Sequence, residues 1–241
     1  MQQTLKRGPT RRSLRSLALV AAQTLMLASF PAAAQIAPAA LEIAAFGPLH
    51  AAAHKGDVAR IKALATARAD LNARDSYGRT PLHVATFARQ REAMRVLIAA
   101  GARTELLEND RYDAVTIASV ADDEDSLRLL LSLGASAKRI TSRYDGTALI
   151  AAAHLGHDGV VRQLIAAGAP LDHVNNLNWT ALIESIVLGN GGARHLATLK
   201  ALLAAGASTR LADRQGNTPL ALAKGRGYRD MVLSLEAAGA R

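Results

Sequence analysis

Three segments of the sequence contain side chains or backbone patterns that are typical of ligand-binding sites. His50 and His54 lie four residues apart, which on a helix is the spacing of a two-histidine metal site. The acidic run Asp-Asp-Glu-Asp at 122–125 carries oxygen atoms of the kind that bind calcium. The run Gly-Asn-Gly-Gly at 189–192 has the small residues of a phosphate-binding loop. Each segment must therefore be tested for the partner residues that its chemistry requires.

None of the three segments has the residues that would complete its site. The histidine pair has no nearby glutamate and no obvious third ligand. The glycine run lacks a following lysine and serine or threonine, and no strand precedes it, so we expect an inserted loop between two helices. The acidic run is expected to begin a helix, where negative side chains interact favourably with the helix dipole. We predict neither a catalytic site nor a bound metal or cofactor.

The composition excludes further classes of function. The 241 residues include no cysteine, which rules out disulfides, thiolate metal ligands and cysteine nucleophiles. The net charge of +9 would favour nucleic acid, but five of the basic residues fall in residues 1–34, which carry no acidic residue. The remainder has 24 basic and 20 acidic residues, so we expect no nucleic-acid partner.

Residues 1–34 are typical of a secretory signal peptide. A basic start is followed by fifteen uncharged residues over 16–30 and by the small residues Ala32-Ala33-Ala34. This apolar stretch is shorter than the roughly 18–20 residues that a helix needs to cross a bilayer. We therefore expect cleavage after Ala34, a short leader segment over 35–45, and a mature protein in the periplasm or secreted, without membrane contact.

Other interpretations of the N-terminus remain open. Arg11 and Arg12 within Thr-Arg-Arg-Ser-Leu resemble a twin-arginine export signal, so the export route is either the general or the twin-arginine pathway. The alternatives to a cleaved signal are an uncleaved membrane anchor and a disordered tail.

Two landmarks recur along the rest of the chain with one period. Gly-Ala pairs follow five apolar segments, and successive pairs are 33, 34, 38 and 33 residues apart. The motif Thr-Pro-Leu or Thr-Ala-Leu recurs in the same register. The glycines are Gly101, Gly134, Gly168, Gly206 and Gly239, and the threonines are Thr80, Thr147, Thr180 and Thr218. Two independent landmarks that share a period predict an array of structural repeats.

The chemistry of helix ends predicts the structure of one repeat. Thr80 can cap a helix with its hydroxyl, and Pro81 suits the first turn because its missing N–H needs no partner. We predict a first helix over about 81–88 and a second over about 91–99, which Gly101 ends in the left-handed conformation. One such unit cannot bury its apolar face alone, so neighbouring units must stack.

This pattern resembles the ankyrin repeat over residues 46–241. The resemblance is carried by DSYGRTPLHVA (75–85), YDGTALIAAAHLGHDGVVRQLIAAGAP (144–170) and DRQGNTPLALA (213–223). It implies an all-α ankyrin-repeat solenoid of stacked helix-turn-helix units with β-hairpin-like finger loops. We divide this domain into six units, at 46–74, 75–107, 108–141, 142–174, 175–212 and 213–241.

Some units depart from the family pattern. The third reads RYDAVTIA at 111–118 and is placed by its spacing rather than by its motif. The fifth carries five extra residues around 189–193, between its two helices. The resemblance also implies that His50 is a framework residue, whose side chain forms hydrogen bonds within and between turns.

The resemblance further implies where a partner binds. Ankyrin proteins usually bind partners on the concave side, which the finger loops and first helices form. Five of the seven aromatic residues of the mature chain fall on this expected surface, interspersed with arginine, a combination that is favoured in protein-binding hot spots. The expected partner-binding residues are Tyr77, Arg79, Phe87, Arg111, Tyr112, Tyr144, His154 and Trp179.

The sequence therefore predicts an exported protein–protein interaction module that is not an enzyme. It would act as a scaffold, stabiliser or inhibitor of envelope proteins, as a monomer with a protein partner. An alternative is an accessory or protective factor for a specific exported enzyme or toxin.

Overall fold

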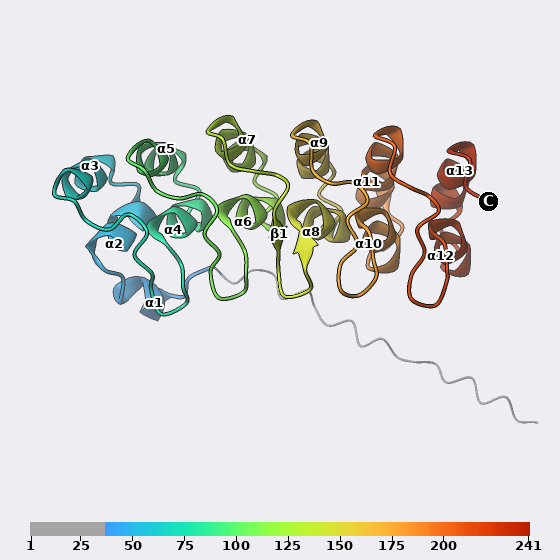
Figure 1. The fold of residues 1–241 in the computed structure, drawn as a ribbon, viewed down its shortest axis with the longest axis horizontal. Helices are drawn as coiled ribbons and strands as arrows, with labels where there is room; N and C mark the ends of the chain where they lie inside the picture. The colour runs from blue at the N-terminus through green and yellow to red at the C-terminus, as the bar shows by residue number, and fades with distance from the viewer. Residues whose placement is uncertain (1–36) are drawn as a thin grey trace, which may run out of the picture. The chain divides into compact units, whose positions relative to one another are not determined.

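The computed structural model describes residues 37–241, which contain six pairs of helices side by side (Figure 1). The signal peptide predicted over 1–34 lies outside the described residues. The first helices form one layer: α2 (Pro48–Lys55), α4 (Pro81–Phe87), α6 (Ala114–Val120), α8 (Ala148–Leu155), α10 (Ala181–Val187) and α12 (Pro219–Gly225). The second helices form the other: α3 (Val58–Thr66), α5 (Arg91–Ala99), α7 (Glu124–Ser132), α9 (Asp158–Ala166), α11 (Ala193–Ala204) and α13 (Arg229–Ala237).

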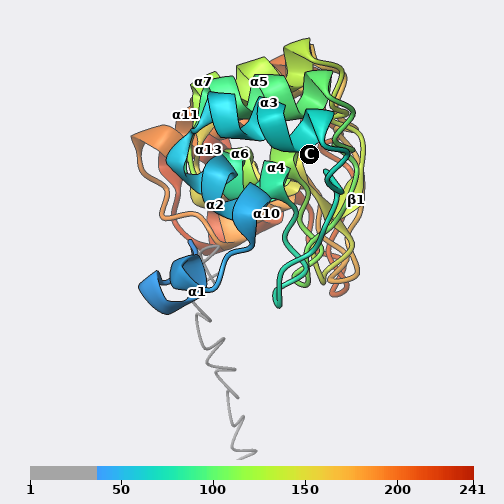
Figure 2. The same cartoon turned by 90° about the vertical axis from the view of Figure 1, so that its left-hand side faces the viewer.

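Loops connect each second helix to the first helix of the next pair and project to one side as fingers (Figure 2). In the described part of the chain, one finger contains paired strands, β1 (Ile140–Thr141) antiparallel to β2 (Gly146–Thr147). A short helix, α1 (Ala40–Ala44), precedes the first pair and lies within the predicted leader. The all-α solenoid with finger loops is thus confirmed, and the helices predicted for one repeat agree with α4 and α5 to within one residue.

The threonine of each repeat motif is the N-cap of a first helix. The side chains of Thr80, Thr147, Thr180 and Thr218 each accept a hydrogen bond from the backbone N–H three residues on. In the irregular third unit Asp113 takes this place and accepts from the N–H of Thr116 at 2.8 Å. A carboxylate caps as well as a hydroxyl, so the unit keeps its geometry although its sequence motif is lost.

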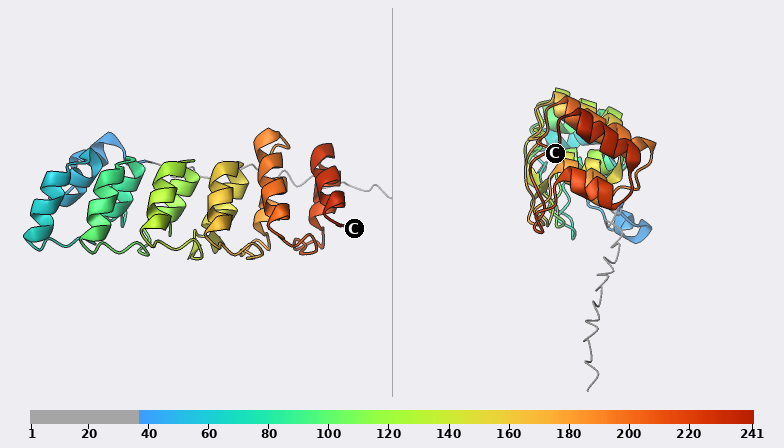
Figure 3. Two further views of the ribbon diagram at one scale, coloured as in Figure 1. Left: turned by 90° about the horizontal axis from the view of Figure 1, so that it is seen from above. Right: turned by 90° about the vertical axis from the view of Figure 1, so that its right-hand side faces the viewer.

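Leucine side chains, with one valine, at equivalent positions form two continuous rows through the stack. One row runs along the first helices and the other along the second helices, and most of these side chains have no accessible surface. The rows are Leu49, Leu82, Val115, Leu149, Leu182 and Leu220, and Leu64, Leu97, Leu130, Leu164, Leu202 and Leu235, of which Leu64 is partly buried. Each helix packs mainly on its counterpart in the next pair and on its own partner (Figure 3), so the core is continuous although each unit is thin.

The inserted residues of the fifth unit lengthen α11, which has 12 residues, whereas each of the other five second helices has nine. Its first turn carries Arg194, whose guanidinium contacts the Asp122 carboxylate at 2.8 and 3.1 Å and the Asp158 carboxylate at 3.4 Å. The insertion also binds the sixth unit, because the Tyr228 hydroxyl donates to the carbonyl of Gly189 at 2.8 Å. The inserted segment therefore connects units three to six.

No helix among residues 37–241 has the length and apolar character needed to cross a membrane.

The extension of α11 yields a prediction for stability. We expect Arg194→Ala to lower the free energy of unfolding by about 1 kcal/mol, because exposed ion pairs are individually weak but this arginine contacts two carboxylates at once. Arg162→Ala is the matched control, since Arg162 pairs with Asp158 within one helix. Urea titration would measure both variants, and an equal loss in the two would contradict a role for Arg194 in joining units.

Candidate functional site

Adjacent fingers are joined at their tips by backbone hydrogen bonds. The N–H of Asn109 donates to the carbonyl of Tyr77 at 3.0 Å, and the N–H of Ser142 donates to the carbonyl of Arg111 at 2.9 Å. A third bond runs from the N–H of Asn176 to the carbonyl of Tyr144, also at 2.9 Å. We call these four connected fingers (residues 75–79, 108–112, 140–147 and 175–179) the finger ladder.

A polar side chain near the start of each finger holds its backbone in shape. Asp75 accepts from the N–H groups of Tyr77 and Arg79, at 2.9 and 2.8 Å. Asn175 accepts in the same way from Leu177 and Trp179, at 3.0 and 2.9 Å. Because these bonds form within each finger, the ladder is ordered before any partner arrives, which lowers the entropic cost of binding.

Six of the eight predicted partner-binding residues lie on the finger ladder, and five of these six are exposed or partly exposed. Tyr77 and Tyr144 are the most exposed aromatic residues there, at 46% and 56%. Arg111 is also exposed and pairs with Asp145 of the next finger at 3.0 Å. Tyr112 and Trp179 are half-buried. The structure thus brings four aromatic side chains onto four consecutive fingers.

The remaining three predicted residues do not present an exposed side chain on the ladder. Phe87 and His154, both partly exposed, lie at the ends of α4 and α8, far along the first helices from the finger connections. Arg79 is at the end of the first ladder finger, but it is buried.

The burial of Arg79 corrects its expected role in partner contact. Its side chain is only 4% exposed and pairs with Asp75 at 2.7 Å and with Glu42 of α1 at 2.8 Å. The Cζ atom of the Arg79 guanidinium lies 4.5 Å from the centre of the Tyr77 ring and 5.7 Å from the centre of the Phe46 ring. If Arg79 left these partners, their buried charges would be unpaired. We therefore conclude that Arg79 holds α1 against the first finger and does not contact a partner. The sequence did not reveal this because the leader shows no repeat pattern.

A buried glutamate on α10 is the functional group that the sequence analysis missed. Glu184 is 4% exposed, and one of its carboxylate oxygens accepts from the side-chain amide of Asn175 at 3.0 Å. The other oxygen is 3.5 Å from Nδ1 of His154 and accepts no hydrogen bond among the described residues. The signal in the sequence is a single charged residue within the apolar run Ala-Leu-Ile-Glu-Ser-Ile-Val.

The surroundings of Glu184 and His154 favour the neutral form of both. Burial raises the pKa of Glu184 to about 7, although the hydrogen bond from Asn175 lowers the pKa in part. Burial also lowers the pKa of His154, and the nearby His195 and His157 lower it further. The pair sits beside Asn175, whose hydrogen bonds link the Glu184 carboxylate to the finger that carries Trp179.

The segments that first suggested chemistry have structural partners. Nε2 of His50 hydrogen-bonds with the backbone carbonyl of Arg79 at 2.9 Å, which is the framework role that the resemblance implied. In the acidic run, Asp123 caps α7 and pairs with Arg91 at 2.9 Å, while Asp122 pairs with Arg194. Within residues 37–241 no group of three histidine, aspartate or glutamate side chains is arranged to hold a metal ion.

The buried glutamate makes stability depend on pH. A glutamate whose pKa is raised in the folded state binds its proton more tightly there, so its contribution to stability is present below about pH 4.5 and is lost as pH rises through about 7. We expect Glu184→Gln to match the wild type near pH 4.5 and to exceed it by about 2–3 kcal/mol at pH 8. Gln keeps the shape and an oxygen for Asn175 but cannot ionise.

Urea unfolding of both proteins at several pH values would measure this difference. Comparing the two proteins at each pH cancels the groups they share, including the buried His83, whose pKa is lowered by burial to about 4. A stability difference that stays constant from pH 4.5 to 8 would mean that Glu184 does not change protonation in the folded protein.

Comparison with known proteins agrees with the geometry. The family model described as ankyrin repeats (3 copies) matches overlapping segments at 25–110, 49–140, 115–198 and 149–240. The ankyrin repeat protein YahD of Escherichia coli (strain K12) is 34% identical over 190 residues, which are 78% of this chain and 94% of that protein.

Solved structures give the same result. An ankyrin repeat domain from Acinetobacter baumannii AYE is 45% identical, with a TM-score of 0.76, over 80% of this chain and 98% of that one. A structure of a predatory endopeptidase from Bdellovibrio bacteriovorus in complex with an immunity protein contains a chain that is 26% identical, with a TM-score of 0.66, over 80% of this chain and 98% of that one. The chain described here belongs to the ankyrin-repeat family.

Proposed function

We propose that this protein is exported and binds an envelope protein along its finger ladder, acting as a scaffold, stabiliser or inhibitor. The observation that carries the proposal is the row of Tyr77, Tyr112, Tyr144 and Trp179 on four fingers that backbone hydrogen bonds hold together. Aromatic side chains supply much apolar contact area and lose few rotamers on binding. Ordered neighbouring fingers present them without a large cost in chain entropy.

The family supports a binding function. Ankyrin repeats are protein–protein interaction modules, and proteins built from them are in general not enzymes. In this chain His50, Asp122 and Asp123, which are among the residues that first suggested chemistry, are engaged in caps, ion pairs and backbone contacts. We include in the proposal that the protein has no catalytic activity, requires no cofactor and works as a monomer.

A second function is favoured by one comparison. The chain resembles part of a complex between an endopeptidase and an immunity protein. A protective factor that binds and inhibits an exported enzyme or toxin would use the same finger ladder, so this alternative differs in the partner and not in the surface. Co-expression with the exported hydrolases of its own cell distinguishes them, because a protective factor would restore growth when one of them is overproduced.

The finger ladder can be tested with alanine variants. We expect Tyr144→Ala and Trp179→Ala each to reduce capture of the partner from envelope extract about tenfold or more, since hot-spot aromatics commonly contribute over 1 kcal/mol. Leu233→Ala is the matched control, because Leu233 is a large apolar residue that is 58% exposed on α13, outside the fingers. Quantitative mass spectrometry would compare the captured proteins, and circular dichroism would check that each variant folds.

If both finger variants capture the same proteins as the wild type, and in equal amounts, the finger ladder is not the binding surface. Loss of capture by Leu233→Ala alone would move the binding surface to the second helices.

Export can be tested on the natural protein. If the N-terminal segment is a cleaved signal, the protein isolated from the periplasm begins at Gln35, immediately after the predicted cleavage site. Intact-mass measurement would identify that terminus, and Arg11→Lys/Arg12→Lys would leave export unchanged if the twin-arginine route is not used. A cytoplasmic protein that retains residue 1 would contradict export.

A further inference from the structure

The positive charge of the described chain is concentrated at one end of the repeat array. Residues 193–241 contain eight basic and three acidic residues. Residues 37–192 contain 16 basic and 17 acidic residues and are close to neutral. The excess charge of the repeat domain therefore belongs to its last two units, where it creates a local positive potential.

Most basic side chains at this end are not neutralised within the chain. Arg194 pairs with two aspartates, and Lys224 pairs with Glu236 at 2.9 Å. Across residues 37–241, the six other basic residues of this end are exposed and have no carboxylate within 4 Å. Lys200 lies on α11, and Arg226 and Arg229 flank the turn between α12 and α13. The other three lie in the last finger and after the C-terminal ends of α11 and α13, and we call them the C-terminal basic face: Arg210, Arg214 and Arg241.

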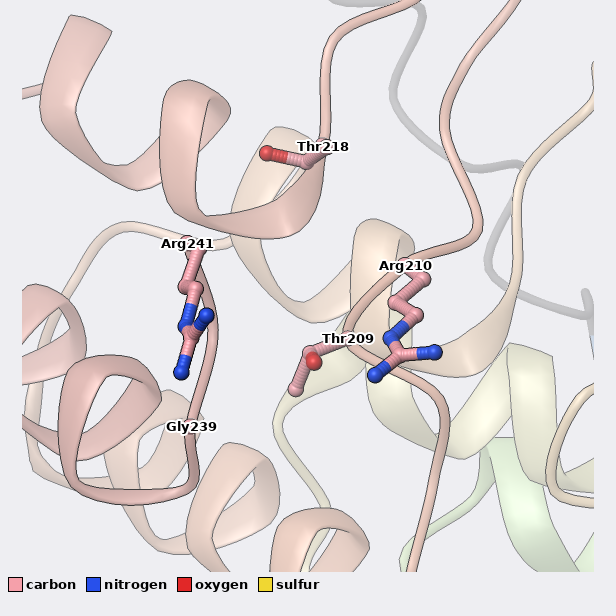
Figure 4. Close-up of a pocket in the computed structure, with 5 residues that line it drawn as sticks. All are labelled: Thr209, Arg210, Thr218, Gly239 and Arg241. Carbon is pink, nitrogen blue, oxygen red and sulfur yellow. The ribbon is translucent and has the colours of Figure 1, made fainter.

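Two of these arginines line a cavity. Arg210 and Arg241 flank Thr209, and Thr218 and Gly239 complete the lining of a cavity of about 300 Å³ (Figure 4). The Thr218 hydroxyl accepts a hydrogen bond from the N–H of Ala221 at 3.3 Å, which leaves its own proton free to donate. The side chains around the cavity thus offer donors of hydrogen bonds and positive charge, the chemistry that recognises an anion.

The basic face adjoins the finger ladder. Arg214, in the last finger, donates from its guanidinium to the backbone carbonyl of Asn176 in the preceding finger. A protein lying along the ladder would therefore reach the C-terminal basic face without leaving the surface. This continuity favours a protein as the source of the anion over a separate ligand.

We propose that the C-terminal basic face binds an acidic segment of the protein partner, one of whose carboxylates enters the cavity between Arg210 and Arg241. Arginine suits this role because its planar guanidinium can donate two parallel hydrogen bonds to one carboxylate. The inference rests on the proposed function, because it assumes that the partner is a protein. It adds that the part of the partner that contacts this end of the array is negatively charged.

The probe for this site is a fluorescein-labelled hexaglutamate peptide added to the full protein. We expect saturable binding that weakens as salt is raised, because exposed charges are screened over about 8–10 Å. Arg210→Glu/Arg241→Glu should weaken binding about tenfold or more, as expected for the loss of charge-assisted hydrogen bonds. Fluorescence anisotropy would measure the affinities.

The matched control is Arg60→Glu/Lys62→Glu. Both residues are exposed on α3 at the opposite end of the array, so this variant changes the net charge by the same amount. Equal weakening in the two variants would show that net charge alone attracts the peptide and would overturn the site.

Two further probes identify the source of the anion. If inorganic phosphate binds at the cavity and the peptide does not, the occupant is not an acidic protein segment. The same conclusion follows if phosphatidylglycerol vesicles bind more tightly than the peptide. If Tyr144→Ala abolishes partner capture and Arg210→Glu/Arg241→Glu leaves it unchanged, the basic face fails while the proposed function stands.

Discussion

The burial of leucine side chains between successive helix pairs is the constraint on which the rest of this structure depends. A single pair has too little apolar surface facing inward to offset the entropy lost on ordering its backbone, so stability comes from the two rows of buried residues that run through all six pairs. Stacking fixes the distance between neighbouring pairs. That distance in turn places one finger beside the next, within reach of the backbone hydrogen bonds that join their tips.

Because the stacking contacts are repeated, individual units can lose the sequence motif without losing their place. In the third unit Asp113 replaces the usual threonine as helix cap, and Val115 replaces the leucine of the buried row. The insertion in the fifth unit is accommodated at the ends of the helices, where extra residues leave the buried rows unchanged. There it adds contacts of Arg194 with units three and four, which a regular repeat would not make.

The surfaces available for binding follow from the same geometry. Fingers and helix ends project from the stack, so their residues vary without cost to the core, and aromatic and basic residues gather there in this chain. Burial limits that freedom at two points. Arg79 holds α1 to the first finger by pairing with the carboxylates of Glu42 and Asp75. Glu184 is buried next to the finger that carries Trp179. Arg79, which was predicted to contact a partner, is thereby removed from the surface. Glu184, whose pKa is raised by burial, is placed beside a finger that was predicted to contact a partner.

The sequence by itself determined the family, the period and the ends of the repeated helices, because caps, prolines and glycines act through neighbours only a few residues away. It also determined which residues fall on fingers, since register follows from period. Only the tertiary structure decided which of those side chains are exposed. Arg79 is buried by Glu42, which lies 37 residues earlier outside the repeats. The proximity of Glu184 to His154, and the placement of Arg210 and Arg241 around one cavity, depend on how successive pairs stack, which no local pattern encodes.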